Sequence, residues 1–279
     1  NWYPGHMKKT RESIQQSLTM VDIVFELIDA RIPASSQNPV IDSIVGEKPR
    51  VIILNKSDLA NSHGNKIWQE YFLKKNISSV CLDALSGKGI DRLLEISYSL
   101  TDEKRKAYEK RGVISRPTRA MILGIPNVGK STLINSLSGR KGAKTGNKPG
   151  VTKSNQWIKT KGNLELLDTP GILWPKFEDP DVGLNLAFTG AIKDEILDIE
   201  TLALRLVERL ANYFPNLLNN RYNIEIEGKS YLEIMEEIGR RRGCIIKGGE
   251  IDYTKVSNIV LDEFRKGVIG NITLEFPKE

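Results

Sequence analysis

Residues 119–139 read RAMILGIPNVGKSTLINSLSG: a short apolar run, a glycine-rich turn, and then a segment with helical spacing. The turn fits the pattern G-x-x-x-x-G-K-[ST] from Gly124 to Ser131. Glycines in such a turn let backbone N–H groups point inward around phosphate oxygens, and the following helix adds its positive end. Because strand, turn and helix occur in the required order, the stretch predicts a phosphate-binding loop.

Individual residues of this loop suggest roles in binding and catalysis. Lys130 can bridge the β- and γ-phosphates, which makes it a catalytic candidate, and the Ser131 hydroxyl can bind Mg²⁺. We expect the following residues to contact the nucleotide's phosphates: Asn127, Val128, Gly129, Lys130, Ser131 and Thr132.

The surrounding sequence predicts the architecture that holds this loop. Short apolar runs rich in β-branched residues are separated by segments of helical length, which suits buried strands of a parallel sheet. These runs lie at 21–31, 50–58, 78–85 and 119–127, with helices expected at 64–76 and 89–110. Residues 156–168 differ, because Lys161-Gly162-Asn163 joins two strand patterns into a predicted antiparallel hairpin at one side of the sheet. The sequence therefore predicts an α/β fold, doubly wound around six mainly parallel strands.

The pattern changes after about residue 180. Apolar residues then recur three and four positions apart, which is typical of amphipathic helices, and these are expected at 200–214, 231–243 and 253–267. We therefore expect a nucleotide-binding domain over residues 1–178 and a separate helical domain over 179–279.

The tetrapeptide Asn55-Lys56-Ser57-Asp58 follows a predicted buried strand, and it precedes the phosphate loop in the chain. Side chains at that carboxyl end project toward the edge where ligands bind in open α/β sheets. A carboxylate at Asp58 can pair with two N–H donors of guanine, whereas adenine would leave it unpaired. The tetrapeptide predicts GTP and GDP as ligands and disfavours a plain ATPase. Asp83 and Ala84, after the next strand, are expected to add a base contact through their backbone.

The strand that ends at Asp168 is followed by Thr-Pro-Gly171. This tetrapeptide is by itself an ordinary turn. Two strands beyond the phosphate loop, however, Asp168 can hold Mg²⁺ through water and the Gly171 N–H can meet the γ-phosphate. Thr152 lies between and can complete the Mg²⁺ shell when γ-phosphate is present, which describes a switch segment. The expected metal ligands are Ser131, Thr152 and Asp168, and Thr152 and Gly171 join Lys130 as catalytic candidates.

The order of these motifs is unusual, because GTPases commonly place the phosphate loop before the guanine-reading tetrapeptide. Joining the original termini and opening the chain elsewhere would keep every strand contact. The motifs in this order resemble the circularly permuted GTPases, and more narrowly the ribosome biogenesis GTPase A (RbgA/YlqF) family. WYPGHM at 2–7 and DARIPASSQNP at 29–39 match further. The resemblance implies a GTPase that binds a large (50S) ribosomal subunit precursor during assembly, with a C-terminal helical domain contacting rRNA.

One departure concerns hydrolysis. Ile172 follows Gly171 where many GTPases have a water-orienting glutamine. Isoleucine cannot orient water, so we expect slow hydrolysis by the free protein and stimulation by the ribosomal particle. The resemblance points to His6 as the missing group, since a neutral imidazole can position water; the alternative is that His6 is merely part of the N-terminal segment. Asn127 resembles an asparagine that lets some GTPases use K⁺ beside Mg²⁺, whereas His63 looks like a loop residue.

Charge and cysteine content bear on partners. Net charge +6 and pI ≈ 9.1 favour a polyanionic partner. Seven Lys or Arg and no acid occur from Arg140 to Lys161, and further basic clusters lie at 104–112 and 240–242; each can also be ordinary solvated charge. No apolar run approaches the roughly 18–20 residues of a membrane span, and Cys81 and Cys244 are too far apart in sequence to suggest a disulfide framework. We expect a cytoplasmic monomer with no membrane partner.

Three functions remain open at this level. The first is an assembly GTPase activated by the ribosomal particle, and the second is a nucleotide-gated RNA-binding module in which hydrolysis is secondary. The third, a signalling GTPase with a protein partner, is disfavoured by the basic stretches. Because the phosphate-binding elements end just past Gly171, the helical domain is tied directly to the switch. GTP is therefore expected to control how the basic surfaces grip rRNA.

Overall fold

The computed structural model divides into two compact units, each described here by itself. One unit comprises Asn1–Glu178 together with Thr273–Glu279, and the other comprises Asp179–Ile272. The division differs from the expected helical domain over 179–279, because the chain returns to the first unit at Thr273. The structure describes residues 12–113, 116–139, 156–160, 162–169, 179–194 and 198–277.

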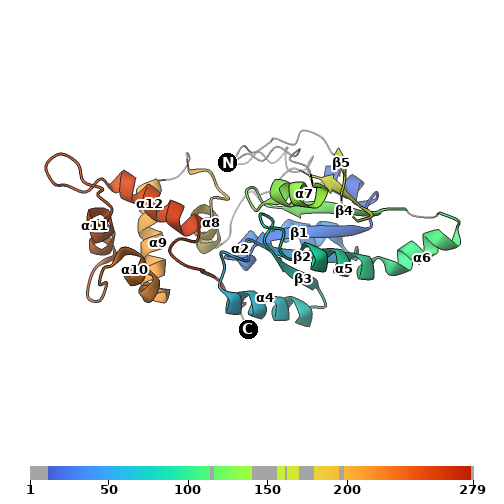
Figure 1. Ribbon diagram of the computed structural model, residues 1–279, viewed down its shortest axis with the longest axis horizontal. Coiled ribbons are helices and arrows are strands. Elements are labelled where there is room, and N and C mark those ends of the chain that lie inside the picture. Colours follow the sequence, from blue (N-terminus) through green and yellow to red (C-terminus); the bar gives the residue numbers. More distant parts are fainter. Residues whose placement is uncertain are drawn as a thin grey trace. The chain divides into compact units, whose positions relative to one another are not determined.

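A six-stranded sheet forms the centre of the first unit, in the order β3-β2-β1-β4-β6-β5 (Figure 1). Neighbouring strands pair in parallel except β5 and β6, which form an antiparallel pair at one edge. The predicted mainly parallel sheet with one edge hairpin is thereby confirmed. The strands are β1 (Ile23–Asp29), β2 (Arg50–Asn55), β3 (Ser78–Leu82), β4 (Thr118–Gly124), β5 (Gln156–Lys159) and β6 (Leu164–Asp168).

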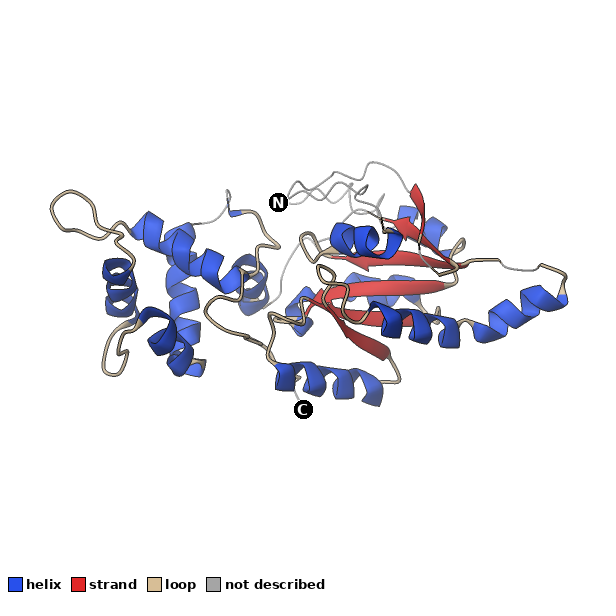
Figure 2. Cartoon of the chain, viewed as in Figure 1, coloured by secondary structure: helices blue, strands red, loops and turns tan. Residues whose placement is uncertain are grey.

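Helices cover both faces of the sheet, as Figure 2 shows in blue around the red strands. Alternate residues of a strand point to opposite faces, and the face of β1 that carries Val24 and Ile28 packs into two clusters built with α3 and α4. Helices α5 and α7 contact β2, β3 and β4. Besides the helical residues 12–18, the described helices of this unit are α2 (Pro33–Ser36), α3 (Pro39–Val45), α4 (Ser62–Lys74), α5 (Ile90–Leu100), α6 (Asp102–Lys110) and α7 (Lys130–Ser138).

The single helix expected over 89–110 is in fact two. Thr101 ends α5 and begins α6, with φ −110° and ψ 5°. Its N–H and its hydroxyl both donate to the Ser97 carbonyl, and these bonds complete the last turn of α5. Asp102 and Glu103 then favour a new helix start, because acidic side chains stabilise a first turn.

The second unit is helical, as predicted. Its longest helix, α9, contacts each of the four other helices, and its inward stripe of Leu202, Leu206 and Leu210 is buried. The helices are α8 (Pro180–Phe188), α9 (Ile199–Tyr213), α10 (Pro215–Tyr222), α11 (Tyr231–Arg241) and α12 (Tyr253–Arg265). Within the described residues of both units, none of the helices combines the length and apolarity that crossing a bilayer requires.

A buried acid in β1 makes the stability of the first unit pH-dependent. Glu26 is 2 % exposed, and burial raises its pKa to about 7, although Arg50 at 3.2 Å favours the charged form. In the unfolded chain the carboxyl titrates near its ordinary value, so the folded protein holds a proton that the unfolded chain has lost between about pH 4.5 and 7. Stability contributed by the protonated form is therefore lost as pH rises through that window.

We expect Glu26→Gln to raise the free energy of unfolding at pH 8 by roughly 3 kcal/mol more than at pH 5. The amide keeps the shape of the protonated acid, and Arg50 retains its ion pair with Asp42. Urea unfolding at the two pH values measures the difference. Glu70→Gln, at an exposed position of α4, is the matched control, and an equal change at both pH values would contradict the assignment.

Candidate nucleotide-binding site

The loops predicted to bind nucleotide all begin at the carboxyl ends of the parallel strands. β1, β2, β4 and β6 are parallel, so their carboxyl ends lie together. Asp29 is in register with Asn55, and Asp168 with Ile122, close to the end of β4. This is the edge at which open α/β sheets bind their ligands.

The guanine loop (residues 55–58) and the phosphate loop (residues 124–131) touch each other through two hydrogen bonds. Asn55 Nδ2 donates to the Val128 carbonyl at 2.8 Å, and Lys56 Nζ donates to the Asn127 carbonyl at 2.9 Å. The partners are 73 and 71 residues apart in sequence. Two motifs far apart in the sequence thus lie in contact, as the binding of one nucleotide by both would require.

Asn55 also binds a third loop, the one that follows β3 and contains Asp83 and Ala84. Its side-chain oxygen accepts from the Ala84 N–H at 3.1 Å, and the residue is 2 % exposed. Ser57 is also held, since its N–H donates to the Leu82 carbonyl. Asp58, by contrast, is exposed. Among the four residues of the guanine loop, Asp58 is the one with an exposed side chain, and its contact with a base stays a prediction.

The Asp83 carboxylate stabilises the turn in which the residue itself lies. Its carboxylate accepts from the N–H groups of Leu85 at 2.9 Å and Ser86 at 3.3 Å. Partial burial tends to raise the pKa of Asp83, but hydrogen bonds from Ser86 and Leu85 lower it below the usual value. Since Ala84 N–H is engaged by Asn55, the expected backbone contact of this loop with a base stays a prediction.

The phosphate loop ends in a left-handed residue that starts α7. Gly129 has φ 103° and caps the helix, so Lys130, Ser131 and Thr132 form its first turn. Backbone N–H groups of a first turn have no partner within the helix and suit an anion. Lys130 Nζ donates to the carbonyls of Gly124 and Ile125, each at 3.1 Å. Burial lowers the pKa of Lys130 to about 8, while the Asp168 charge raises it.

The residues predicted to bind Mg²⁺ fit that ion. Ser131 offers a hydroxyl and Asp168 a carboxylate, and Mg²⁺ takes oxygen donors, with phosphates and water completing its shell. Asp168 ends β6 in register with Ile122 of β4, the strand that leads into the phosphate loop, and the neighbouring Thr169 hydroxyl donates to the Ile122 carbonyl. Ser131 and Asp168 would therefore hold the ion.

Three predicted catalytic or metal-binding residues, His6, Thr152 and Gly171, lie outside the described residues, so their roles stay predictions. The same holds for Ile172 and for most of the basic stretch from 140 to 161. Asn127 is exposed with φ 59°, and its proposed use of K⁺ is likewise untested by this structure.

Two residues that the sequence had not assigned to a role adjoin the site. Asp29 and Arg31 are both 2 % exposed, and the Asp29 carboxylate lies 3.1 Å from Lys56 Nζ. The sequence signal that could have revealed them is Asp-Ala-Arg at the end of an apolar strand. Charged residues are rarely fully buried unless they are paired, so two opposite charges at this position could have indicated a buried ion pair.

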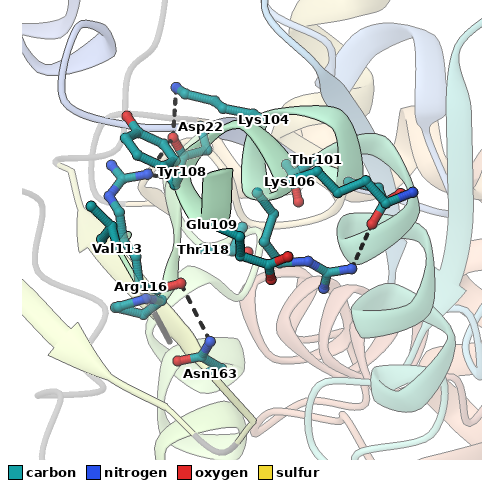
Figure 3. Close-up of a pocket in the computed structure, with 13 residues that line it drawn as sticks. Asp22, Thr101, Lys104, Lys106, Tyr108, Glu109, Val113, Arg116, Thr118 and Asn163 are labelled. Atoms are coloured by element: carbon teal, nitrogen blue, oxygen red, sulfur yellow. Dashed lines mark hydrogen bonds and ion pairs between the residues drawn. The ribbon is translucent and has the colours of Figure 1, made fainter. Parts of the chain in front are cut away.

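A separate cavity of about 560 Å³ lies at the amino ends of the strands, beside α6 (Figure 3). Asp22, which precedes β1, is 5 % exposed. Its carboxylate binds Lys104 at 2.6 Å and Arg116 at 3.2 Å, and Arg116 stacks on the Tyr108 ring at 4.2 Å. These contacts anchor α6 to the end of the sheet that is opposite the nucleotide loops.

Comparison with known proteins identifies the relatives of this chain. A family model described as "50S ribosome-binding GTPase" matches residues 119–232. The match begins at β4, after the guanine loop, in agreement with the reversed motif order. Two solved structures are similar: a GDP-bound structure of TM YlqF, at TM-score 0.71 and 27 % identity over 96 % of this chain and 100 % of that one, and GNP-bound YlqF from T. maritima, at 0.65 and 27 % over 97 % and 99 %.

Curated relatives cover nearly the full length. Ribosome biogenesis GTPase A of Priestia megaterium is 48 % identical over 279 residues, which is 100 % of this chain and 97 % of the relative. The Thermotoga maritima protein of the same name is 32 % identical over 279 residues, covering 100 % and 95 %. These matches confirm the resemblance inferred from the motifs: the chain is a GTPase and belongs to the ribosome biogenesis GTPase A family.

Proposed function

We propose that this protein is a cytoplasmic GTPase that acts on a late precursor of the large (50S) ribosomal subunit. The observation that carries the proposal is the pair of hydrogen bonds by which Asn55 and Lys56 join the guanine loop to the phosphate loop. The relatives are named for ribosome biogenesis, and the matching family model is described as 50S-binding.

Within the proposed site each group has a distinct task. Asp58 selects guanine, and the first turn of α7 holds the phosphates with Lys130, whose ammonium opposes the charge that develops on the γ-phosphate. Bound Mg²⁺ would neutralise further phosphate charge. We assign His6 the task of positioning the attacking water, because Ile172 cannot perform it.

Helix α6 supports an RNA partner. Seven of its nine residues are charged, and none is buried. Asp102 pairs with Arg105 and Lys106 at 2.6 Å along the helix, and exposed pairs of this kind contribute little stability. Lys104, Lys106 and Lys110 are exposed. Although Lys104 also pairs with Asp22, a helix with no buried residue and three exposed lysines suits phosphate groups, and its contribution to binding should fall steeply with salt.

Nucleotide control of RNA binding is the second part of the proposal. Thr152 and Gly171 are assigned as contacts of γ-phosphate, and the helical unit follows them at Asp179. GTP then favours one placement of the helical unit on rRNA and GDP another, since a ligand shifts an equilibrium by its different affinities for the two states. An rRNA footprint that is the same with GTP and GDP would argue instead for a module that binds RNA without nucleotide control.

The test combines a GTPase assay with co-sedimentation on 50S precursor particles. We expect particles to stimulate turnover of the wild type at least tenfold, because binding to the particle would place His6 where it can position the attacking water. His6→Ala should co-sediment with the particles yet lose that stimulation. His63→Ala is the matched control, because the chain has two histidines and His63 is exposed; contrary to the expectation of a loop, it lies in the first turn of α4. Turnover unchanged by particles would count against an assembly GTPase.

A further inference from the structure

A buried ion pair lies where β1 ends, beside the guanine loop. The Arg31 guanidinium donates to the Asp29 carboxylate from Nε at 2.9 Å and from Nη2 at 2.7 Å, and the Arg31 backbone N–H adds a bond at 3.1 Å. Burial would raise the pKa of Asp29, but the charges of Arg31 and Lys56 hold it well below its usual range. Asp29 is therefore a fixed negative charge within the first unit.

Lys56 connects this carboxylate to the phosphate loop. Its Nζ lies 3.1 Å from Asp29 Oδ2 and donates to the Asn127 carbonyl at 2.9 Å. The Lys56 backbone has φ 58°, in the left-handed region that side-chain-bearing residues rarely adopt. Since Asp58 follows two residues later, the position of Lys56 influences where the base-reading carboxylate stands.

The return segment (residues 273–277) packs on the chain that carries this ion pair. The Leu274 N–H donates to the Arg31 carbonyl at 2.8 Å. Glu275 accepts from the Ser35 N–H at 2.9 Å and from the Ser35 hydroxyl, and its carbonyl accepts from Trp68 Nε1 at 2.9 Å. The segment thus fixes both sides of the DARIPASSQNP stretch: the backbone of Arg31 and the start of α2.

We propose that Asp29 and Arg31 are positioning residues for guanine-nucleotide binding, and that the return segment holds them in place. Arg31 orients the Asp29 carboxylate, which holds Lys56 across to the phosphate loop, so the two nucleotide-binding loops keep the spacing that the ligand needs. The inference rests on the proposed placement of guanine at Asp58. It gives a role to DARIPASSQNP, a stretch that the sequence analysis matched to the family without assigning it a function.

This arrangement also couples the nucleotide to the helical unit. The return segment follows the helical unit directly in the chain, at Ile272. A partner that draws the segment away from Arg31 and Ser35 weakens nucleotide binding, and bound nucleotide in turn retains the segment, because the coupling of two binding equilibria is reciprocal.

The full-length protein tests both parts. Affinity for a fluorescent GDP is measured for wild type, Asp29→Asn, Glu275→Gln and the double variant, together with KM and kcat for GTP. Asp29→Asn removes the charge that holds Lys56, so it should weaken GDP binding by roughly tenfold or more. Its KM for GTP should rise while kcat stays within about twofold. Glu275→Gln should weaken GDP binding by a smaller factor, about threefold. Glu70→Gln on α4 is the matched control.

The outcomes separate a positioning role from a structural one. A variant that merely unfolds in part loses active enzyme, so its apparent kcat falls while KM stays constant, and that result would overturn the positioning role. If Asp29→Asn does not fold, the proposal stands or falls on Glu275→Gln, which alters a partly exposed position. If the loss of GDP affinity in the double variant equals the product of the losses in the two single variants, the return segment does not act through Asp29. If Asp58→Asn changes base preference while Asp29→Asn binds GDP like wild type, this inference fails and the guanine site stands.

Discussion

The Asp58→Asn variant is expected to lose affinity for GDP by roughly 10³-fold and to prefer XDP instead. The Asp58 carboxylate offers two acceptors to the two N–H donors of guanine. An asparagine amide has one acceptor and one donor, so it matches xanthine, whose second position is a carbonyl. A mismatch leaves a polar group of the ligand or protein unpaired, which is the costly outcome in a site built for hydrogen bonding.

Titration of the variant with GDP, XDP and ADP measures this preference. Asp91→Asn is a suitable control, because that aspartate is exposed in the first turn of α5 and lies outside the proposed site. Retention of GDP preference by Asp58→Asn would remove the base-reading assignment, and with it the reason for treating the guanine and phosphate loops as one site.

Gly129→Ala is expected to reduce nucleotide affinity by roughly 10²-fold or more, since displaced catalytic or binding groups lose their geometry. A Cβ at this position would lie 2.3 Å from Asn55 Nδ2. Asn55 is itself fixed by Val128 and Ala84, so it cannot move without breaking the contacts between three loops. The methyl group therefore pushes the guanine and phosphate loops apart.

Backbone strain and collision can be separated by a matched variant. Gly46 has φ 58°, and a Cβ built there meets nothing within 4 Å. Gly46→Ala should cost about 1–2 kcal/mol of stability from its left-handed backbone and leave GDP affinity unchanged. Calorimetric titration with GDP and thermal unfolding of both variants supply the two readouts. Equal loss of affinity in both would mean that strain, rather than contact with Asn55, explains the result.

The sheet was predictable because each strand carries its own signal. Apolar runs such as those ending at Asn55 and Gly124 are recognisable without reference to the rest of the chain. Of the helices named above, α2, α3, α8 and α10 were not predicted. Each of them has proline at its first positions, where the missing N–H has no cost. At these places proline starts a helix, so its presence does not mark a loop.

The candidate site was predictable at the level of motifs but not of individual tasks. The sequence grouped Asn55 and Lys56 with Asp58 as nucleotide contacts, and nothing in the tetrapeptide reveals that the first two hold neighbouring loops together. Asp29 and Arg31 were missed because a buried ion pair is defined by its surroundings, which a local pattern does not contain. The docking of Glu275 on Ser35, 240 residues away, has no local signal either.

The return segment has a consequence for how the protein is made. A chain leaves the ribosome from its amino end, so the six strands emerge first, the whole helical unit second, and residues 273–277 after both. The contact of Leu274 with Arg31 cannot form until then. If the return segment supports the nucleotide-binding loops as proposed, a nascent or prematurely terminated chain lacks this support and should bind GTP more weakly than the finished protein.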